Sequence, residues 1–238
     1  MTRAYHIFPL GDSALTIDFG NVIDEQINAQ VLELFRITQA LKLPGIRDLV
    51  PAYSSLTIHY DLVAIKGDRL FPSAFEMLST QMIGILNDHS LDAASRKPEI
   101  KRIPVCYEEA FGPDLSFIEG ERKKPVEEII RLHAEKVYRV YMTGFLPGFP
   151  YMGRVDEKIA VPRKPAPVPV AAGSVGIAGM QTGIYPLASP GGWQIIGRTP
   201  VTIFDRDRRE PVLLQPGDEV QFYPITRYEF ENYKGRHS

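Results

Sequence analysis

Several features that mark common classes of protein are scarce or missing in this sequence. Its 238 residues include one cysteine, Cys106, so no disulfide forms within the chain, as is usual in a reducing cytoplasm. No apolar run approaches the roughly 18 residues of a membrane-spanning helix, and Pro9 and Gly11 interrupt the start before a secretion signal could form. The net charge is −2, without the basic cluster that nucleic acid or a membrane surface would attract. We therefore expect a cytoplasmic protein with neither of these partners.

The motifs of familiar catalytic and cofactor sites are missing as well. Gly173, Gly176 and Gly179 are spaced as GxxGxxG, but no Gly-Lys-Ser/Thr follows, which excludes a phosphate loop. Ser174 is preceded at Ala172 by alanine where the nucleophile elbow of a hydrolase needs glycine. The five histidines are scattered without the spacing of metal ligands. The sequence therefore predicts no metal and no cofactor bound by this chain alone.

Glycine and proline are distributed unevenly, which indicates two different architectures. Residues 144–200 hold ten of the nineteen glycines and nine of the twenty prolines, whereas residues 1–98 hold five of each. Residues 88–99 show no periodicity and are typical of a linker. We predict a small domain over residues 1–87, this linker, and a second domain over residues 100–238.

The first domain is predicted to be of the α+β class. Apolar and polar residues alternate over 14–19 and 55–62, which is typical of half-buried strands. Apolar residues recur on one helical face over 27–41 and again over 71–85. The predicted order is ββαββα, a sheet packed against helices.

From residue 100 onward the pattern changes to short strands separated by Gly and Pro turns. A strand over 100–107 and a short helix over 124–136 come first. Further strands are predicted over residues 136–142, 200–205, 211–215 and 219–225. Many short strands with frequent turns predict a closed or nearly closed β-barrel.

A polar and aromatic group of residues on glycine-rich turns is the best candidate for a binding site. Its members are Arg163, Gln181, Tyr185, Trp193 and Arg198. The charge-poor segment 173–200 carries most of them, and its glycines allow sharp turns and close backbone approach. The arginines carry two-pronged donors that suit a carboxylate. The pattern predicts an ordered pocket wall for a small anionic or amide ligand; the alternative is barrel turns, core aromatics and solvent-exposed arginines.

His133 is the one candidate for acid–base catalysis. It shares a helical stripe with Val126, Ile129 and Ile130. A histidine on an apolar face is usually a packed core residue, but burial also shifts its pKa, as catalysis often requires. Both a core role and a catalytic role stay open at this point.

Blocks along nearly the whole chain resemble one family. The segments GFLPGFPYMG (144–153), AGSVGIAGMQTGIYP (172–186) and SPGGWQIIGRTP (189–200) resemble the signature blocks of allophanate hydrolase subunit 1. GDSAL (11–15) and PAYSSLTIHYD (51–61) resemble its amino-terminal domain. The resemblance implies a small α/β amino-terminal domain followed by a cyclophilin-like β-barrel.

The resemblance also implies a function and partners. The family includes subunits of ATP-dependent 5-oxoprolinases, which open 5-oxo-L-proline to L-glutamate. Its members act with partner subunits A and C, the latter being of the allophanate hydrolase subunit 2 type, so the chain is expected to be inactive alone and the assembled complex to use ATP. The alternative is a regulatory protein like the inhibitor KipI, which docks on a histidine kinase and blocks its autophosphorylation. A biotin-dependent carboxyltransferase half is a third interpretation, but the chain has no biotin-carrier sequence.

One departure from the family pattern concerns arginine. The family usually has a second Pro-Arg between the pair that corresponds to Pro162-Arg163 and the AGSV block. Residues 164–175, KPAPVPVAAGSV, contain no arginine. One anion contact that the resemblance implies is therefore missing or supplied from elsewhere.

Limited proteolysis tests the predicted boundary. Mild digestion should cut first within residues 88–99, which have few apolar anchors, and leave a stable fragment that begins near Ile100. Mass spectrometry of the fragments locates the cut. First cleavage within residues 173–200 would instead show that the glycine-rich segment is a mobile loop.

Overall fold

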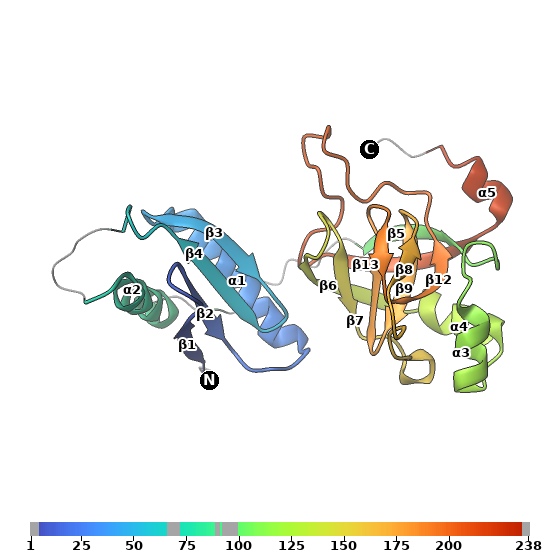
Figure 1. Ribbon diagram of the computed structural model, residues 1–238, viewed down its shortest axis with the longest axis horizontal. Coiled ribbons are helices and arrows are strands. Elements are labelled where there is room, and N and C mark those ends of the chain that lie inside the picture. The colour runs from blue at the N-terminus through green and yellow to red at the C-terminus, as the bar shows by residue number, and fades with distance from the viewer. Residues whose placement is uncertain (1–4, 66–71, 89–90, 92–99, 235–238) are drawn as a thin grey trace. The chain divides into compact units, whose positions relative to one another are not determined.

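A computed structural model describes residues 5–65, 72–88, 91 and 100–234. The chain divides into two compact units, Met1–Arg96 and Lys97–Ser238, each with its own hydrophobic core (Figure 1). The predicted linker 88–99 lies outside the described residues except for positions 88 and 91, as does Phe71 of the second predicted helix.

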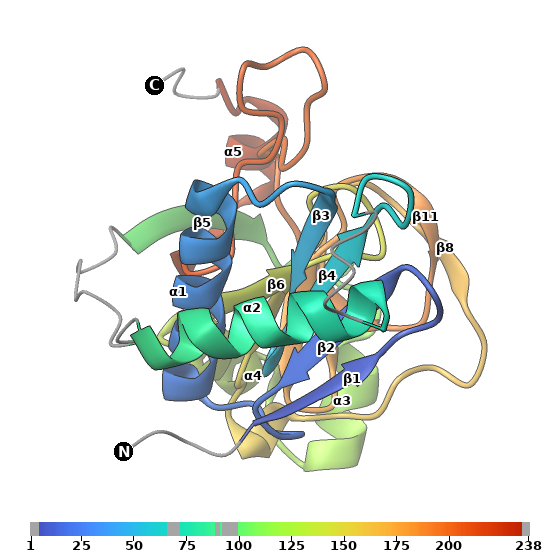
Figure 2. The same cartoon turned by 90° about the vertical axis from the view of Figure 1, so that its left-hand side faces the viewer.

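The first unit has the predicted order ββαββα. Its elements are β1 (His6–Pro9), β2 (Ala14–Asp18), α1 (Glu25–Leu41), β3 (Ile46–Pro51), β4 (Ser55–Tyr60) and α2 (Ala74–Asp88). The strands form one antiparallel sheet in the order β1-β2-β4-β3. Leu15 faces Ile58 and Ile17 faces Leu56 across β2 and β4, and these side chains pack with apolar residues of both helices. Both helices therefore lie on one face of the sheet (Figure 2).

The second unit contains the predicted barrel. Seven strands close it in the order β10-β7-β6-β13-β5-β12-β9, and a separate ribbon pairs β11 with β8. Its strands are β5 (Ile100–Cys106), β6 (Val137–Thr143), β7 (Pro150–Gly153), β8 (Val168–Val170), β9 (Ser174–Ala178), β10 (Gln181–Ile184), β11 (Ser189–Gly191), β12 (Gln194–Arg198) and β13 (Glu219–Ile225). Its helices are α3 (Leu115–Arg122), α4 (Val126–Ala134), the short 3-10 turn η1 (Glu157–Ile159) and α5 (Arg227–Glu231). The predicted α+β class and the closed barrel are confirmed.

Alternation along the barrel strands separates two apolar clusters. One cluster takes buried residues from all seven barrel strands and therefore fills the interior; Ile177 and Ile184 belong to it. The other cluster consists of Phe149, Val170, Ala178, Tyr185, Trp193 and Ile195 and is called here the outer cluster. Because neighbours along a strand point to opposite sides, Ala178 and Gly183 face this outer cluster.

Parts of the barrel differ from the sequence-based expectation. Helix α3 was not predicted, since only Leu115 and Ile118 among its eight residues are buried. The strands predicted over 200–205 and 211–215 are reduced to a single bridge between Phe204 and Val212, with two backbone hydrogen bonds beside it. Each of these segments begins with a proline, which has no N–H to donate to a ladder.

The glycine-rich segment 173–200 is ordered, as predicted, because it forms strands β9 to β12. Gly173 has φ +82°, and a Cβ at this position would collide with the carbonyl oxygen of Thr199. Gly120 lies in α3, and a Cβ there would meet nothing within 4 Å.

These two glycines give a matched stability test. Gly173→Ala should lower the free energy of unfolding of the barrel by about 1–3 kcal/mol, the cost of a strained backbone. Gly120→Ala should leave it unchanged or raise it by up to about 1 kcal/mol, since alanine favours helix. Fluorescence of Trp193, the only tryptophan of the chain, reports unfolding of this unit. Equal effects of the two substitutions would contradict the strained role of Gly173.

Candidate functional site

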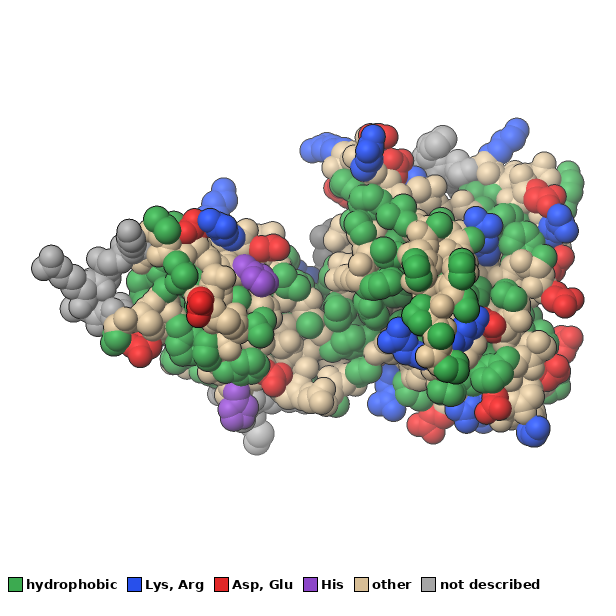
Figure 3. Space-filling model, in the orientation of Figure 1, with side chains coloured by type: hydrophobic (Ala, Val, Ile, Leu, Met, Phe, Trp, Pro, Cys, Tyr) green, Lys and Arg blue, Asp and Glu red, His purple; other side chains and the backbone are tan. Residues whose placement is uncertain are grey.

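The structure brings together three of the five predicted binding residues. Tyr185 and Trp193 belong to the outer cluster, and Arg163 lies against the adjoining Gly192. Gln181 begins β10 on the same side as Gly183, which faces the cluster, and is half-buried there. On the face of the barrel unit seen in Figure 3, hydrophobic side chains lie next to Lys and Arg groups over β8 and β9.

The outer cluster is built around Phe149. Its ring meets those of Tyr185 and Trp193 edge to face, with centroids 5.1 and 5.3 Å away. Tyr151 closes the group at 4.7 Å from Phe149 and 5.9 Å from Trp193. Phe149, Tyr185 and Trp193 are buried, whereas Tyr151 is partly accessible. The arrangement is a rigid aromatic wall, because each ring is held by at least two others or by backbone.

Two glycines allow this wall to form. A Cβ at Gly191 would overlap the hydroxyl of Tyr185, which accepts a hydrogen bond from the backbone N–H of Trp193. A Cβ at Gly192 would lie 3.4 Å from Nη2 and 3.5 Å from Nε of Arg163. The guanidinium therefore lies across the backbone of Gly192, where any larger residue would press on it.

Arg163 is the polar group of this site that is free to bind a ligand. The structure shows no hydrogen bond or ion pair of its guanidinium with any described residue, and its side chain is exposed. Burial raises the pKa of Tyr151 and Tyr185, and the positive charge of Arg163 opposes this rise in both phenols. Both tyrosines therefore stay protonated near neutral pH and can donate. An unpaired guanidinium beside two phenols suits a carboxylate.

Arg198 has a different environment. Its Nε donates to the carbonyl oxygen of Ala172 at 2.7 Å, and its Cζ lies 5.8 Å from the ring centroid of Phe230 in α5. These contacts tie the end of β12 to α5 and to the turn before β9. The structure does not bring Arg198 to Arg163, so its predicted role in carboxylate binding has no geometric support.

His133 lies among the inward-facing aromatic residues, with no exposed surface. Its ring stacks on Phe222 at 4.6 Å. Thr182 donates to the carbonyl oxygen of Gly176 at 3.0 Å, so its hydroxyl accepts from Nε2–H of His133 at 2.9 Å. The hydroxyl of Tyr107 then donates to Nδ1 at 2.9 Å. Both ring nitrogens are satisfied internally, which favours the core role over the catalytic one.

Burial is also the cause of the charge state of His133. It lowers the pKa of the imidazole to about 3, so the ring is neutral at physiological pH. Thr182 and Tyr107 were not predicted as its partners. The period-two pattern of β10 places Thr182 inside, but only the closed barrel shows which side chain it meets.

Metal binding and membrane insertion find no support in the described residues. No group of three or more His, Cys, Asp or Glu side chains is arranged to hold a metal ion in the described part of the chain. None of the described helices has the length and apolar character needed to cross a membrane. Cys106 is free and buried at the end of β5, where burial raises the pKa of its thiol.

Comparison with known proteins adds the family. The profile described as "Carboxyltransferase domain, subdomain C and D" matches residues 5–214. The chain belongs to this family. Two relatives of this carboxyltransferase-domain protein are named as the B component of 5-oxoprolinase. The one from Bacillus subtilis (strain 168) is 41% identical over 237 residues, 98% of either chain. The one from Escherichia coli O157:H7 is 39% identical over 193 residues, 80% of this chain and 84% of the relative.

Solved structures show the same fold for this carboxyltransferase-domain protein. TTHA0988 superposes with a TM-score of 0.76 at 35% identity, over 89% of this chain and 40% of its own. PH0987 from Pyrococcus horikoshii is 40% identical over 94% of this chain and 100% of its own, with a TM-score of 0.54. The Kluyveromyces lactis urea carboxylase, at 22% identity and a TM-score of 0.74, shares the fold over 22% of its own length. The chain thus spans less than half of some solved relatives and all of another.

The buried imidazole predicts a loss of stability in mild acid. The unfolded chain binds a proton at His133 below about pH 6.5, whereas the folded chain does so only near pH 3. The unfolded state therefore holds more protons between these values, and the free energy of unfolding falls as pH drops through this window. At pH 5 the His133 contribution to this loss should be about 2 kcal/mol.

Urea unfolding followed by Trp193 fluorescence at pH 7 and pH 5 measures the loss. His133→Gln should remove this part of the pH dependence, and His6→Gln, at an exposed position, should retain it. If His133→Gln does not fold, ring ¹⁵N signals of the wild type decide, since they should show a neutral, Nε2-protonated imidazole at pH 5. A protonated ring at pH 5 would contradict the assignment.

Proposed function

We propose that the chain is a non-autonomous subunit of a 5-oxoprolinase that acts with partner subunits A and C. The relatives named as the B component of 5-oxoprolinase support this, because one of them matches 98% of this chain at 41% identity. The longer relatives support a multi-chain role as well, since TTHA0988 carries polypeptide beyond the 40% of its length that this chain covers.

The observation that carries the proposal is the unpaired guanidinium of Arg163 beside Tyr151 and Tyr185. 5-Oxoproline is a flat, five-membered cyclic amide with one carboxylate. In the proposed role, Arg163 binds that carboxylate and the aromatic wall packs on the ring, with Gln181 and the tyrosine hydroxyls as hydrogen-bonding groups for the amide. Trp193 fixes the wall from behind.

The chemistry of the reaction explains why partners are needed. An unstrained cyclic amide is a poor electrophile, so ATP is expected to activate its carbonyl oxygen by phosphorylation before water adds to the carbon. The C–N bond then breaks, and glutamate, ADP and phosphate are the products. The sequence contains no phosphate loop, so the nucleotide site belongs to a partner or to an interface with one.

Reconstitution tests the subunit role. The purified chain alone should release no glutamate from 5-oxoproline and ATP, whereas the chain combined with its partner subunits A and C should turn over. Turnover by the lone chain would contradict the proposal, and so would the absence of turnover by a well-folded complete set. In the latter case, inhibition of a histidine kinase's autophosphorylation by the chain would support the regulatory alternative.

Substitution of Arg163 tests the binding site. Arg163→Ala should leave the melting temperature and assembly unchanged, because the side chain is exposed and makes no described polar contact. Turnover by the complex should fall at least about tenfold, equivalent to about 1.4 kcal/mol of lost transition-state stabilisation. Arg206→Ala, at an exposed arginine in the 206–210 turn, is the matched control and should change neither quantity. Wild-type turnover by the Arg163→Ala complex would remove Arg163 from the site.

A further inference from the structure

An ion pair between Asp114 and Lys164 lies directly behind the candidate site. The Asp114 carboxylate and the Lys164 ammonium are 2.6 Å apart, and their side chains are only 16% and 18% exposed. Withdrawing two charges from water is costly, and such pairs often add little to stability. Its presence therefore needs a reason other than stability.

The position of Asp114 is unusual for its place in the fold. It is the N-cap residue of α3, yet its side chain makes no capping hydrogen bond to the helix. Its carboxylate instead accepts from the backbone N–H of Ile195 at 2.6 Å, and its own N–H donates to the carbonyl oxygen of Ile195 at 3.0 Å. Asp114 thus fixes the start of α3 to β12 and presents its charge to Lys164.

Residues 162–164 are held on both sides of Arg163. The backbone N–H of Lys164 donates to the carbonyl oxygen of Gly192 at 2.7 Å, and Nε2 of Gln194 donates to the carbonyl oxygen of Pro162 at 3.2 Å. The Lys164 ion pair is the third tie. Arg163, between them, has no described polar partner of its own, so its orientation depends on its two neighbours.

We propose that the Asp114–Lys164 ion pair is a positioning device, which holds the guanidinium of Arg163 over Gly192 and ready for a carboxylate. The carboxylate's identity as that of 5-oxoproline rests on the proposed function, whereas the placement of Arg163 does not. Asp114 and Lys164 act through Arg163 and touch no substrate themselves.

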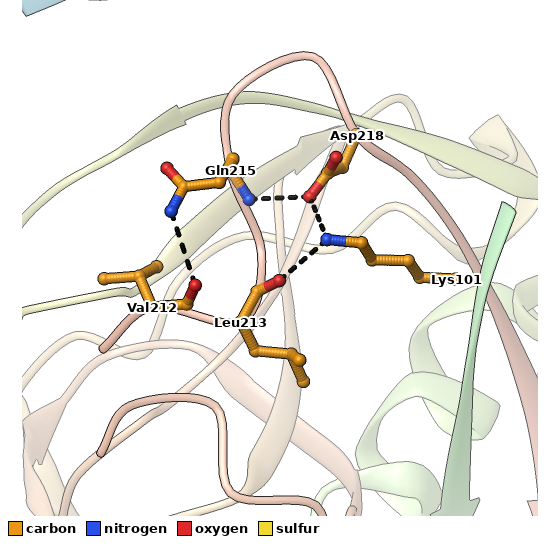
Figure 4. Close-up of polar contacts among 5 residues, drawn as sticks. All are labelled: Lys101, Val212, Leu213, Gln215 and Asp218. Atoms are coloured by element: carbon orange, nitrogen blue, oxygen red, sulfur yellow. Dashed lines mark hydrogen bonds and ion pairs between the residues drawn. The ribbon is translucent and has the colours of Figure 1, made fainter. Parts of the chain in front are cut away.

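The barrel contains a matched control pair. Nζ of Lys101 lies 2.7 Å from Oδ2 of Asp218, and that same oxygen accepts from the backbone N–H of Gln215 at 2.7 Å (Figure 4). Like Asp114, Asp218 therefore combines one lysine with one backbone N–H. It joins β5 to the turn before β13, and none of its described partners belongs to the site. Asparagine at either position can keep the backbone hydrogen bond while it loses the ion pair.

The test compares Asp114→Asn with Asp218→Asn in the reconstituted complex. Both substitutions should lower the melting temperature of the barrel, followed by Trp193 fluorescence. Only Asp114→Asn should raise the KM for 5-oxoproline, by at least about tenfold, because a displaced arginine removes binding to the carboxylate. In an Arg163→Ala background, Asp114→Asn should raise KM no further, since residues that act through one group are not additive.

Other outcomes would overturn the proposal. An equal rise in KM from Asp114→Asn and Asp218→Asn would assign both pairs to general stability, as would a full further rise in the Arg163→Ala background. If the wild-type complex does not turn over 5-oxoproline, the proposed function fails, and crystal structures of the wild-type and Asp114→Asn chains decide the positioning role. A guanidinium that leaves Gly192 only in the variant supports it, and one that stays overturns it.

Discussion

Closure of the seven-stranded barrel forces each strand to divide its side chains between a packed interior and an outer face. Along β10 this places Thr182 and Ile184 inside, and Gly183 outside against Phe149. The absence of side chains at Gly176 and Gly183 leaves the outer face thin enough for Trp193 and Phe149 to lie directly on the backbone. The aromatic wall thus depends on the barrel, which holds its glycines at fixed positions and its rings in contact.

The two faces treat polar groups in opposite ways. Inside, His133 is neutral, and its hydrogen bonds with Tyr107 and Thr182 satisfy a group that would otherwise be costly to bury. Outside, charge is retained: Lys164 is paired with Asp114, and the adjacent Arg163 is left unpaired by any described residue. An internal network that is complete has no capacity for a ligand, whereas an oriented but unpaired guanidinium has.

The family relationship and the geometry point to the same division of labour. The chain corresponds to almost the whole of its Bacillus subtilis relative, and to a part of longer solved relatives. A wall with one anion-binding group is half of a site. In the proposed complex, nucleotide binding and bond cleavage require groups that partner subunits bring to this face, and the barrel contributes the recognition of the cyclic substrate.

The sequence by itself determined the two architectures, the ββαββα order and the barrel, because period-two alternation, helical stripes and Gly/Pro turns are local signals. It also determined the family, and it selected Arg163, Tyr185 and Trp193 from composition and motif blocks. It did not show that Arg198 bonds to Ala172 and faces Phe230, or that His133 is enclosed. It gave no sign that Asp114 pairs with Lys164, fifty positions along the chain. Only the tertiary structure decided these, because barrel closure brings distant segments together in a register that no local pattern specifies.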